Sequence, residues 1–468
     1  MDLREVSQAI KATVITGRLD RQVSGISIDS RTLRPGELFF ALPGERVDGY
    51  RYVKQALAQG GAGAVVSQLD DSGEEGCPWA GTLLQVPDTL RALQQLACYW
   101  RDKCGVPIIG VTGSNGKTTT KDLIFSVLQE RLPVLKTEGN LNTEIGLPLT
   151  LLRLKGWHQA AVLEMAMRGP GQIGFLCQMA RPVVGVITNI GTAHFELLGS
   201  RENIARAKGE LLEALPEGGL AVLNREDSGS LFLGEKLQEK GTVQVLYYGF
   251  GADADLRAEN LKKSLEGVEF ILDYRGQKQE VHLPLPGEHN VLNSLAAAAV
   301  GCHLGMTLPE IAGGLSQAII SEKRLEKRRG IGGSIIINDT YNANPASVKA
   351  SLGVLSVASG RRIAVLGDMR ELGSLTEEGH REIGRYIVEK GIDYLLTVGE
   401  LARWIGEEAR SGGMDPTRVH SVMTNQDAGE KLRFLLGEGD VVLLKGSRTM
   451  ALEEVAESLW ERERGEAP

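Results

Sequence analysis

The segment 111–120 holds the residue types that bind the phosphates of a nucleotide. Gly113 and Gly116 let the backbone curl so that several N–H groups converge on one anion. Lys117 can then reach the β- and γ-phosphates, and the hydroxyl of Thr118 can ligate Mg²⁺. These residue types and their spacing predict a nucleotide site.

The segment departs in one place from the usual phosphate-loop spacing, which has a glycine at position 111. This chain has Val111 there, although the shorter core Gly-x-x-Gly-Lys-Thr is intact. An apolar run at 106–111 predicts a buried strand before the loop, and apolar residues at helical spacing follow over 121–130. A chance glycine–lysine turn would not need these two elements, so the sequence favours nucleotide binding.

Three further candidates follow predicted strands or lie in a predicted helix. Glu164 ends an apolar strand at 160–164, and ligands collect at strand carboxyl ends in α/β sheets. It could ligate Mg²⁺ or water, or simply cap the strand. His194 follows a strand at 182–190, although a single histidine is more often structural. Lys208 would ordinarily be a solvated lysine on a helix.

Side-chain amides gather in two places. The segment 137–146 includes Asn140 and Asn142, and suits either a plain loop or a site for a polar ligand. Asn290 and Asn293 enter an alanine-rich helix at helical spacing, where they could contact a base or ribose.

Length and composition limit the possible classes of protein. The 468 residues suggest roughly three domains, with 42% hydrophobic and 24% charged residues. The net charge of −8 argues against general nucleic-acid binding. Without an apolar run of about 18 residues, or the pattern of a signal peptide at the start, we expect no membrane insertion. The five scattered cysteines predict reduced, mostly buried thiols in the cytoplasm.

The chain is predicted to be an α/β protein of three domains. The first, 1–103, is a small α/β domain, the second, 104–322, resembles a P-loop ATPase, and the third, 323–468, is Rossmann-like and doubly wound. Strands of the first domain are predicted at 25–31, 38–42, 64–66 and 82–86, with helices at 3–13, 52–59 and 90–102. In the first domain, 29–31 is either a solvated strand end, which the residue types favour, or a grip on a charged molecule.

Alternation of strands and helices predicts a parallel sheet in the third domain. The strands are expected at 334–339, 362–367, 393–398 and 440–444, and the helices at 347–357, 377–390, 401–410 and 427–436. The segments 367–373 and 445–448 would both lie at carboxyl ends of strands, where ligands bind.

Taken together, these motifs resemble the Mur ligase family of ATP-dependent amide-forming ligases. The loop at 113–119 looks like the family's phosphate loop, and the other matching residues follow in the family's order: Glu164, His194, Lys208, the Gly-Glu-His-Asn at 287–290, Asn293, Arg324 and the Lys-Gly-Ser-Arg at 445–448. One departure is Asn142-Thr143, where the family often has two asparagines.

Two segments indicate the branch of the family that adds D-alanyl-D-alanine. They are Asp-Thr-Tyr-Asn-Ala-Asn-Pro at 339–345 and Gly-Asp-Met-Arg-Glu-Leu-Gly at 367–373. The branch that adds a third amino acid has a stretch of the Tyr-Ala-His-Thr-Pro type instead, and folate-type ligases have Ala-His-Asn-Pro.

The resemblance implies a role for each matching residue. Catalysis would involve Lys117, Lys208 and His194. Mg²⁺, as two ions, would be held by Thr118, Glu164, His194 and Lys208, the last as a carbamate formed with CO₂. ATP would contact Gly113, Ser114, Asn115, Gly116, Lys117, Thr118, Thr119, Asn290, Asn293, Arg324, Asp339, Tyr341, Asn342 and Asn344. The other substrates would contact Ser30, Arg31, Asn140, Asn142, Asp368, Arg370, Lys445, Ser447 and Arg448.

The implied reaction joins D-alanyl-D-alanine to UDP-N-acetylmuramoyl-tripeptide through an acyl phosphate, in peptidoglycan precursor synthesis. The first domain would bind the UDP end, the second ATP and the third the dipeptide, in a cytoplasmic monomer. One alternative is a related Mur-type or folylpolyglutamate-type ligase with a different amine acceptor. A nucleotide-gated switch protein is an alternative from another class, because a phosphate loop also serves such proteins.

Overall fold

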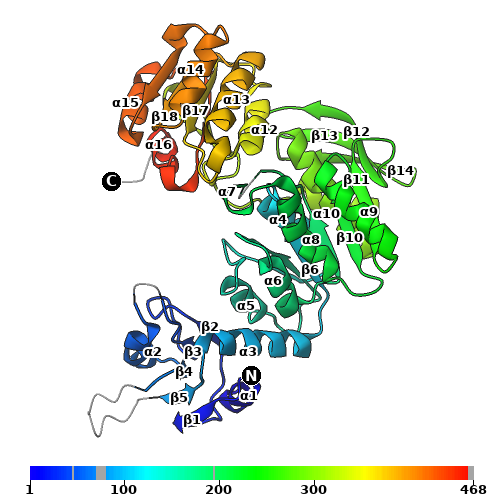
Figure 1. The fold of residues 1–468 in the computed structure, drawn as a ribbon, viewed down its shortest axis with the longest axis vertical. Helices are drawn as coiled ribbons and strands as arrows, with labels where there is room; N and C mark the ends of the chain where they lie inside the picture. Colours follow the sequence, from blue (N-terminus) through cyan, green and yellow to red (C-terminus); the bar gives the residue numbers. More distant parts are fainter. Residues whose placement is uncertain (45–46, 70–80, 193–194, 462–468) are drawn as a thin grey trace. The chain divides into compact units, whose positions relative to one another are not determined.

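The computed structural model describes residues 1–44, 47–69, 81–192 and 195–461. The chain divides into two compact units, whose elements are labelled in Figure 1. Unit 1 consists of Met1–Gly110, Leu132–Met167 and Gln172–Val183. Unit 2 consists of Val111–Arg131, Arg168–Gly171 and Val184–Pro468.

A five-stranded sheet forms the first part of unit 1, in the order β1-β5-β4-β3-β2. The strands are β1 (Thr13–Thr16), β2 (Gly25–Ser27), β3 (Glu37–Phe40), β4 (Gly63–Val66) and β5 (Thr82–Gln85). Only β1 runs antiparallel to its neighbour. The helices are α1 (Leu3–Ala9), α2 (Val53–Ala58) and α3 (Thr89–Cys104).

Two predictions for this region were too long. The helix predicted at 3–13 ends at Ala9, because Lys11 adopts a left-handed φ of 52° and the β-branched residues of β1 then form a strand. The strand predicted at 25–31 ends at Ser27, since the carboxylate of Asp29 accepts the backbone N–H of Arg31 and turns the chain.

The rest of unit 1 packs around α3. Asp88 caps the start of α3 by accepting the N–H of Arg91, and Trp100 donates its ring N–H to the carbonyl of Leu154. The remaining elements are β7 (Val134–Lys136), α5 (Gly146–Leu151), β8 (Ala160–Glu164) and α6 (Gln172–Ala180), and β7 pairs parallel with β8. The strand predicted at 160–164 is confirmed.

The chain passes from unit 1 into unit 2 within β6 (Ile108–Thr112) and continues into α4 (Lys117–Gln129). Strands of unit 2 then follow in the order β14-β13-β12-β11-β10-β9. They are β9 (Val184–Ile187), β10 (Leu220–Asn224), β11 (Gln244–Gly249), β12 (Leu256–Lys263), β13 (Val268–Tyr274) and β14 (Gln277–Leu283). The helices are α7 (Phe195–Leu198), α8 (Arg201–Glu213), α9 (Ser228–Lys240), α10 (Glu288–His303) and α11 (Leu308–Ser316).

The antiparallel strands β12 to β14 were not predicted from the sequence. Their signal is weak because β12 and β14 each expose several residues and their polar side chains interrupt the apolar pattern. The turn between β13 and β14 is a two-residue hairpin turn, in which Arg275 and Gly276 both have positive φ.

The third sheet lies in unit 2 and has the order β15-β16-β20-β17-β18-β19. Its strands are β15 (Glu326–Arg329), β16 (Ile335–Asn338), β17 (Arg362–Gly367), β18 (Tyr394–Val398), β19 (Val419–Val422) and β20 (Val441–Lys445). The helices are α12 (Pro345–Leu355), α13 (Thr376–Glu389), α14 (Arg403–Ser411), α15 (Asn425–Leu435) and α16 (Glu453–Ser458). All strand pairs are parallel except β15 with β16.

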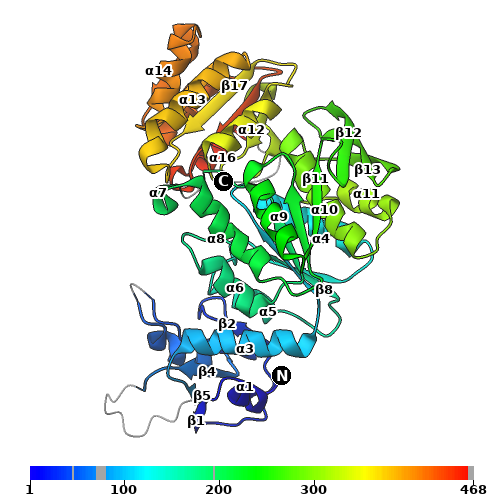
Figure 2. The same ribbon diagram turned by 45° about the vertical axis from the view of Figure 1, so that its right-hand side comes forward.

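Successive residues of the third sheet alternate between two cores, as a doubly wound sheet requires. Leu366 packs with residues of α12, α13 and α14, whereas Val365 packs with residues of α15 and α16. Figure 2 shows the first three of these helices beside β17. The predicted doubly wound third domain is therefore confirmed, with one antiparallel edge strand in addition.

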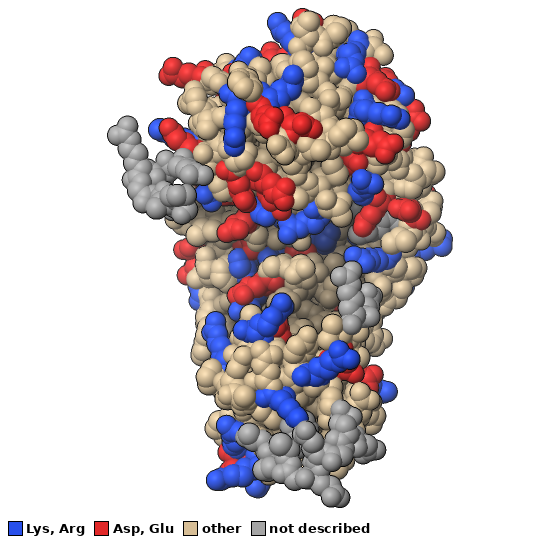
Figure 3. Space-filling view, turned by 90° about the vertical axis from the view of Figure 1, so that its left-hand side faces the viewer, with Lys and Arg blue, Asp and Glu red and all other residues tan. Residues whose placement is uncertain are grey.

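The surface charges, the helices and the cysteines bear on the predictions about nucleic-acid binding, membrane insertion and buried thiols. Basic and acidic side chains alternate over the face shown in Figure 3, rather than forming one basic surface. No helix among the described residues is long and apolar enough to cross a membrane.

Cys177 is buried, but Cys98, Cys104 and Cys302 are half-buried, so the expectation of mostly buried thiols was wrong for these three. Cys77 lies outside the described residues.

Candidate active site

The predicted phosphate loop connects β6 to α4, and two of its glycines are required by close neighbours. A Cβ atom on Gly113 would lie 1.8 Å from the hydroxyl of Thr188. A Cβ atom on Gly116, whose φ is 79°, would lie 2.6 Å from Oδ1 of Asn293. Asn293 of α10 therefore lies against the loop, and its Oδ1 also accepts the hydroxyl of Thr120.

Two lysines meet at this loop. Lys117 Nζ donates to the carbonyl of Gly113 at 2.9 Å, and Lys208 Nζ donates to the same oxygen at 3.0 Å. The interpretation of Lys208 as an ordinary solvated lysine was wrong, because its side chain is 2% exposed and lies on the buried face of α8. Burial, and secondly the charge of Lys117, hold the pKa of Lys208 well below its ordinary value.

Arg324 brings a third positive charge to the loop. Its Nη2 donates to the hydroxyl of Thr118 at 2.9 Å, and its guanidinium lies 4.3 Å from the ring centre of Tyr341. Arg448 lies 5.6 Å from the same ring. Among the described residues, neither Arg324 nor Lys208 is paired with a carboxylate, and Nε of Arg324 is buried without a hydrogen-bond partner. A polar anion such as phosphate would satisfy these groups.

Asn344 links the start of α12 to the loop. Its Oδ1 accepts the N–H of Ser347 and so caps the helix, while its Nδ2 donates to Oδ1 of Asn115 at 2.7 Å. The pattern Asn-Ala-Asn-Pro at 342–345 thus has a direct structural use, because the proline after Asn344 occupies the first helical position.

Asp339 and Lys445 form a buried pair that also holds the backbone of this segment. Lys445 Nζ lies 2.6 Å from Oδ2 of Asp339 and donates to the carbonyl of Asn342 at 3.0 Å. Ser351 donates to the same carboxylate oxygen. Both predicted site residues therefore have strong partners within the protein, which gives them a part in shaping the segment 339–344.

Asn290 and His289 lie at the start of α10. Asn290 donates to the carbonyl of Pro286 and accepts from Nδ2 of Asn293, so the two predicted asparagines are joined. Burial, opposed by Asp339 and aided by Lys445, lowers the pKa of His289 to about 4. His289 is therefore neutral near pH 7.

Glu164 lies in unit 1 at the end of β8, as predicted. Its Oε1 accepts Nδ2 of Asn142 at 2.7 Å, and its backbone N–H donates to the hydroxyl of Thr137. The side chain is 3% exposed, and Oε2 is buried with no hydrogen-bond partner among the described residues. Asn140 is exposed in the same segment. His194 lies outside the described residues.

Asp368 and Ser447 are occupied by contacts within the third sheet. Oδ1 of Asp368 accepts the N–H groups of Leu401 and Ala402, both at 2.9 Å, and its Oδ2 accepts Nη2 of Arg370. Ser447 accepts the backbone N–H of Arg370 at 2.8 Å. Arg370 and Arg448 keep more than half of their side chains exposed, so they are the members of this predicted set that remain accessible to a ligand.

In the first sheet's domain, Ser30 is buried and donates to Gln55 at 3.1 Å. The Arg31 guanidinium is paired with Asp29 at 2.7 Å and is 82% exposed, and this pairing lowers the pKa of Asp29. The ion pair with Asp29 therefore holds the exposed guanidinium of Arg31 in one orientation.

Two residues that sequence analysis passed over, Thr188 and Asn189, contact the loop directly after β9. Their signal was their position at the carboxyl end of a buried strand, the same argument that singled out Glu164.

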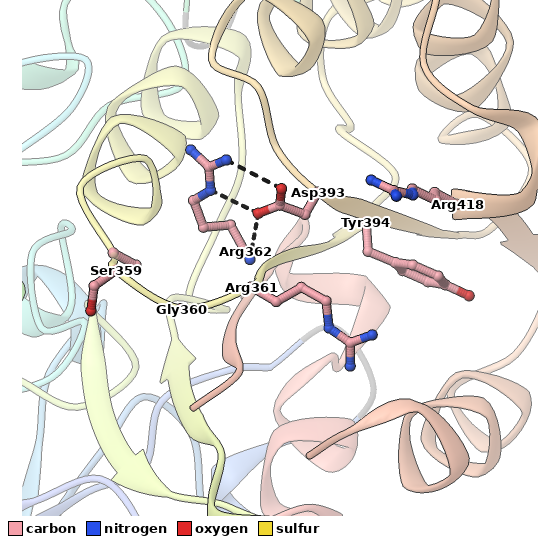
Figure 4. A pocket seen from close by; sticks show the side chains of 8 residues that line it. Ser359, Gly360, Arg361, Arg362, Asp393, Tyr394 and Arg418 are labelled. Atoms are coloured by element: carbon pink, nitrogen blue, oxygen red, sulfur yellow. Dashed lines mark hydrogen bonds and ion pairs between the residues drawn. The ribbon is translucent and has the colours of Figure 1, made fainter. Parts of the chain in front are cut away.

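A separate pocket lies at the amino ends of the strands of the third sheet (Figure 4). Arg361, Arg362, Asp393, Tyr394 and Arg418 line it. Arg362 pairs with Asp393 at 2.8 Å, so its charge is already balanced. Because each of these residues begins β17 or β18 or lies just before β17, β18 or β19, the pocket is at the opposite edge of the sheet from Gly367 and Lys445.

Comparison with known proteins places the chain in a family. Three family models match it: "Mur ligase family, catalytic domain" at 22–101, "Mur ligase middle domain" at 111–301 and "Mur ligase, glutamate ligase domain" at 323–448. The UDP-N-acetylmuramoyl-tripeptide–D-alanyl-D-alanine ligase of Bacillus subtilis (strain 168) is 38% identical over 464 residues, covering 98% of each chain. The enzyme of that name from Escherichia coli (strain K12) is 34% identical, covering 96% of this chain and 97% of its own.

Solved structures agree. MurF from Acinetobacter baumannii superposes with a TM-score of 0.87 at 32% identity, covering 98% of each chain. MurF ligase from Thermotoga maritima, in complex with ADP, has a TM-score of 0.78 at 29% identity, covering 93% of this chain and 96% of its own. The chain belongs to the Mur ligase family and has the three-domain α/β fold of these structures. The resemblance inferred from its motifs is confirmed.

Proposed function

We propose that this protein is an ATP-dependent, ADP-forming ligase that joins D-alanyl-D-alanine to UDP-N-acetylmuramoyl-tripeptide. The observation that carries the ligase assignment is the convergence of Lys117, Lys208 and Arg324 on one phosphate loop. The choice of substrates rests on relatives of that name, which match the chain over nearly its whole length.

The chemistry needs an activated carboxylate, because a free carboxylate does not react with an amine at neutral pH. Transfer of the γ-phosphoryl group of ATP to the substrate carboxylate gives an acyl phosphate. The amine of the dipeptide attacks the carbonyl carbon of the acyl phosphate. The amide C–N bond forms, the nitrogen loses a proton to water, and phosphate leaves with the electrons of the C–O bond. Lys117 and Arg324 neutralise the phosphoryl oxygens as charge shifts during the transfer.

Mg²⁺ fits the residues that are present. Glu164 has a buried carboxylate oxygen without a partner, held in place by the bond from Asn142 to its other oxygen. Oxygen ligands of this kind are those Mg²⁺ prefers. By the resemblance alone, Glu164, Thr118 and His194 would together hold the metal, which would supply a counter-charge for the phosphates. Asn142 is then a positioning residue for Glu164.

Lys208 is proposed to act as a carbamate. Its lowered pKa raises the share of neutral amine, the form that reacts with CO₂. The amine nitrogen forms a bond to carbon, electrons of one C=O bond move to oxygen, and a proton is released to water. This replaces a cation beside Lys117 with an anionic oxygen that can ligate Mg²⁺.

Mass spectrometry of the intact, nucleotide-bound enzyme should detect the added mass of one CO₂ on Lys208. Lys208→Ala should be inactive and regain part of its activity with short carboxylates, whereas Lys208→Arg should stay inactive. An unmodified Lys208 in the active, nucleotide-bound enzyme would exclude the carbamate.

The remaining substrate sites are proposals by domain. Residues 1–103 would bind the UDP end through Ser30 and Arg31, 104–322 would bind ATP, and 323–468 would bind the dipeptide through Arg370 and Arg448. Asp368, Lys445 and Ser447 would support that site, since their polar atoms are already bonded. Because each chain carries all three domains, we propose that it acts as a monomer, in the cytoplasm where ATP is available.

Phosphate release with a panel of amines tests the whole assignment. With UDP-N-acetylmuramoyl-tripeptide and ATP, D-alanyl-D-alanine should support turnover, while diaminopimelate, lysine and glutamate should not. A faster reaction with a single amino acid would favour a third-residue-adding or folylpolyglutamate-type ligase. ATP hydrolysis without amide formation would favour a nucleotide-gated switch.

A further inference from the structure

Thr188 and Asn189, the two residues that follow β9, form a clamp that holds the backbone of the phosphate loop. Oδ1 of Asn189 accepts the N–H of Asn115 at 3.0 Å, and Nδ2 of Asn189 donates to the carbonyl of Asn115 at 3.0 Å. One side-chain amide thus satisfies both backbone groups of a single loop residue. The hydroxyl of Thr188 donates to the same carbonyl at 2.5 Å, and the backbone carbonyl of Asn189 accepts the N–H of Ser114.

The clamp itself is held from the other side. The N–H of Ile190 donates to Asp227, the residue that caps α9, at 3.1 Å. Arg201, the first residue of α8, donates to the carbonyl of Ile190 at 2.9 Å. The N–H of Gly191 donates to the hydroxyl of Ser114 at 2.8 Å. Asn189 is therefore fixed by two helices and by the strand it follows.

This arrangement decides which loop amides can bind phosphate. The N–H groups of Ser114 and Asn115 are used within the protein, so they are not available to a ligand. The amides of Thr118 and Thr119, in the first turn of α4, have no acceptor within their helix. A phosphate would therefore be bound by the start of α4, and the direction of those amides depends on the peptide that Asn189 holds.

We propose that Asn189 is a positioning residue for the nucleotide phosphates, acting through the backbone of Asn115. It does not touch the ligand. It fixes the loop in the form in which the amides at the start of α4 converge. The proposal rests on the assignment of this loop to ATP.

The test compares Asn189→Ala with a matched variant, Asn425→Ala, in the full-length protein. Asn425, the first residue of α15, is also a half-buried asparagine, and its Nδ2 donates to the backbone carbonyls of Met450 and Ala451 rather than to the phosphate loop. Calorimetric titration with ADP and Mg²⁺ should show about 10- to 100-fold weaker binding for Asn189→Ala, from the loss of two hydrogen bonds. Asn425→Ala should bind ADP as the wild type does.

Two further readouts separate positioning from general damage. The KM for ATP should rise in Asn189→Ala while the KM for D-alanyl-D-alanine stays unchanged, and the melting temperature without ligand should match that of Asn425→Ala. Asn189→Asp keeps the acceptor for Asn115 but loses the donor, so it should also bind ADP more weakly.

Three results would count against the inference or its basis. Equal ADP affinity in Asn189→Ala and Asn425→Ala would overturn the positioning role. A common rise in both KM values, with a lower melting temperature in both Asn189 variants, would show a general structural role instead. If the wild type binds no ADP, the assigned function itself fails.

Discussion

Lys117 and Lys208 donate hydrogen bonds to one acceptor, the carbonyl oxygen of Gly113. Two ammonium groups this close repel each other, and the repulsion contributes to the lowered pKa of Lys208. An anion bound at the loop would relieve the repulsion, as would removal of the charge on Lys208. Electrostatic repulsion between the two lysines therefore favours the binding of a phosphate at this loop.

Replacing Lys117 with alanine should abolish most of the turnover. The transferring phosphoryl group would lose its nearest cation, a loss that typically costs about 100- to 1,000-fold in kcat. Phosphate release is the measurement, and Lys240→Ala, at the exposed end of α9, is the control. Near-normal turnover in a folded Lys117→Ala protein would refute the assignment of this loop to ATP.

Arg324→Lys should lower kcat/KM for ATP by about 10-fold. Lysine keeps the charge but loses the planar group that stacks on Tyr341 while donating to Thr118. Steady-state kinetics with varied ATP provides the measurement. Arg328→Lys is a matched control, because Arg328 also stacks on an aromatic ring, that of Trp460 at 4.1 Å, away from the loop. Equal effects of the two changes would argue that Arg324 serves only the fold.

His289 should make stability depend on pH. Its pKa falls from the ordinary 6.5 to about 4 on folding, so the unfolded chain binds the proton first as pH falls. The stability that neutral His289 allows is thus present above pH 6.5 and lost as pH falls toward 4, by at most about 3 kcal/mol. His289→Gln should lose less in melting temperature than the wild type over this interval.

Parallel melting curves for the wild type and His289→Gln between pH 7 and about 4 would contradict the lowered pKa.

Asp368→Ala should destabilise the protein by about 3 kcal/mol, because it leaves the buried N–H groups of Leu401 and Ala402 without an acceptor. Glu217→Ala, at an exposed site, should change stability little. Thermal melting measures both. If Asp368→Ala instead keeps its melting temperature and only raises the KM for the dipeptide, the carboxylate binds substrate directly.

Local patterns predicted the loop, its strand and its helix, since glycines, a lysine and apolar spacing within about 25 residues specify them. They could not predict that Lys208 is buried, because its partner Gly113 is far away in the sequence and only the packing of α8 brings them together. Likewise, Asn189 has no distinctive spacing, and its role depends on where β9 ends. The strands β12 to β14 were missed because their exposed polar residues weaken the apolar pattern.

The side-chain amide of Asn344 makes two contacts: its Oδ1 caps the start of α12, and its Nδ2 donates to the side chain of Asn115. Any displacement of α12 from the phosphate loop must therefore break this 2.7 Å hydrogen bond. By thermodynamic linkage, if nucleotide binding strengthens this hydrogen bond, the hydrogen bond strengthens nucleotide binding by the same free energy. Acceptor binding to the third sheet, if it shifts α12, would then change the dissociation constant for ATP without any direct contact between the two ligands.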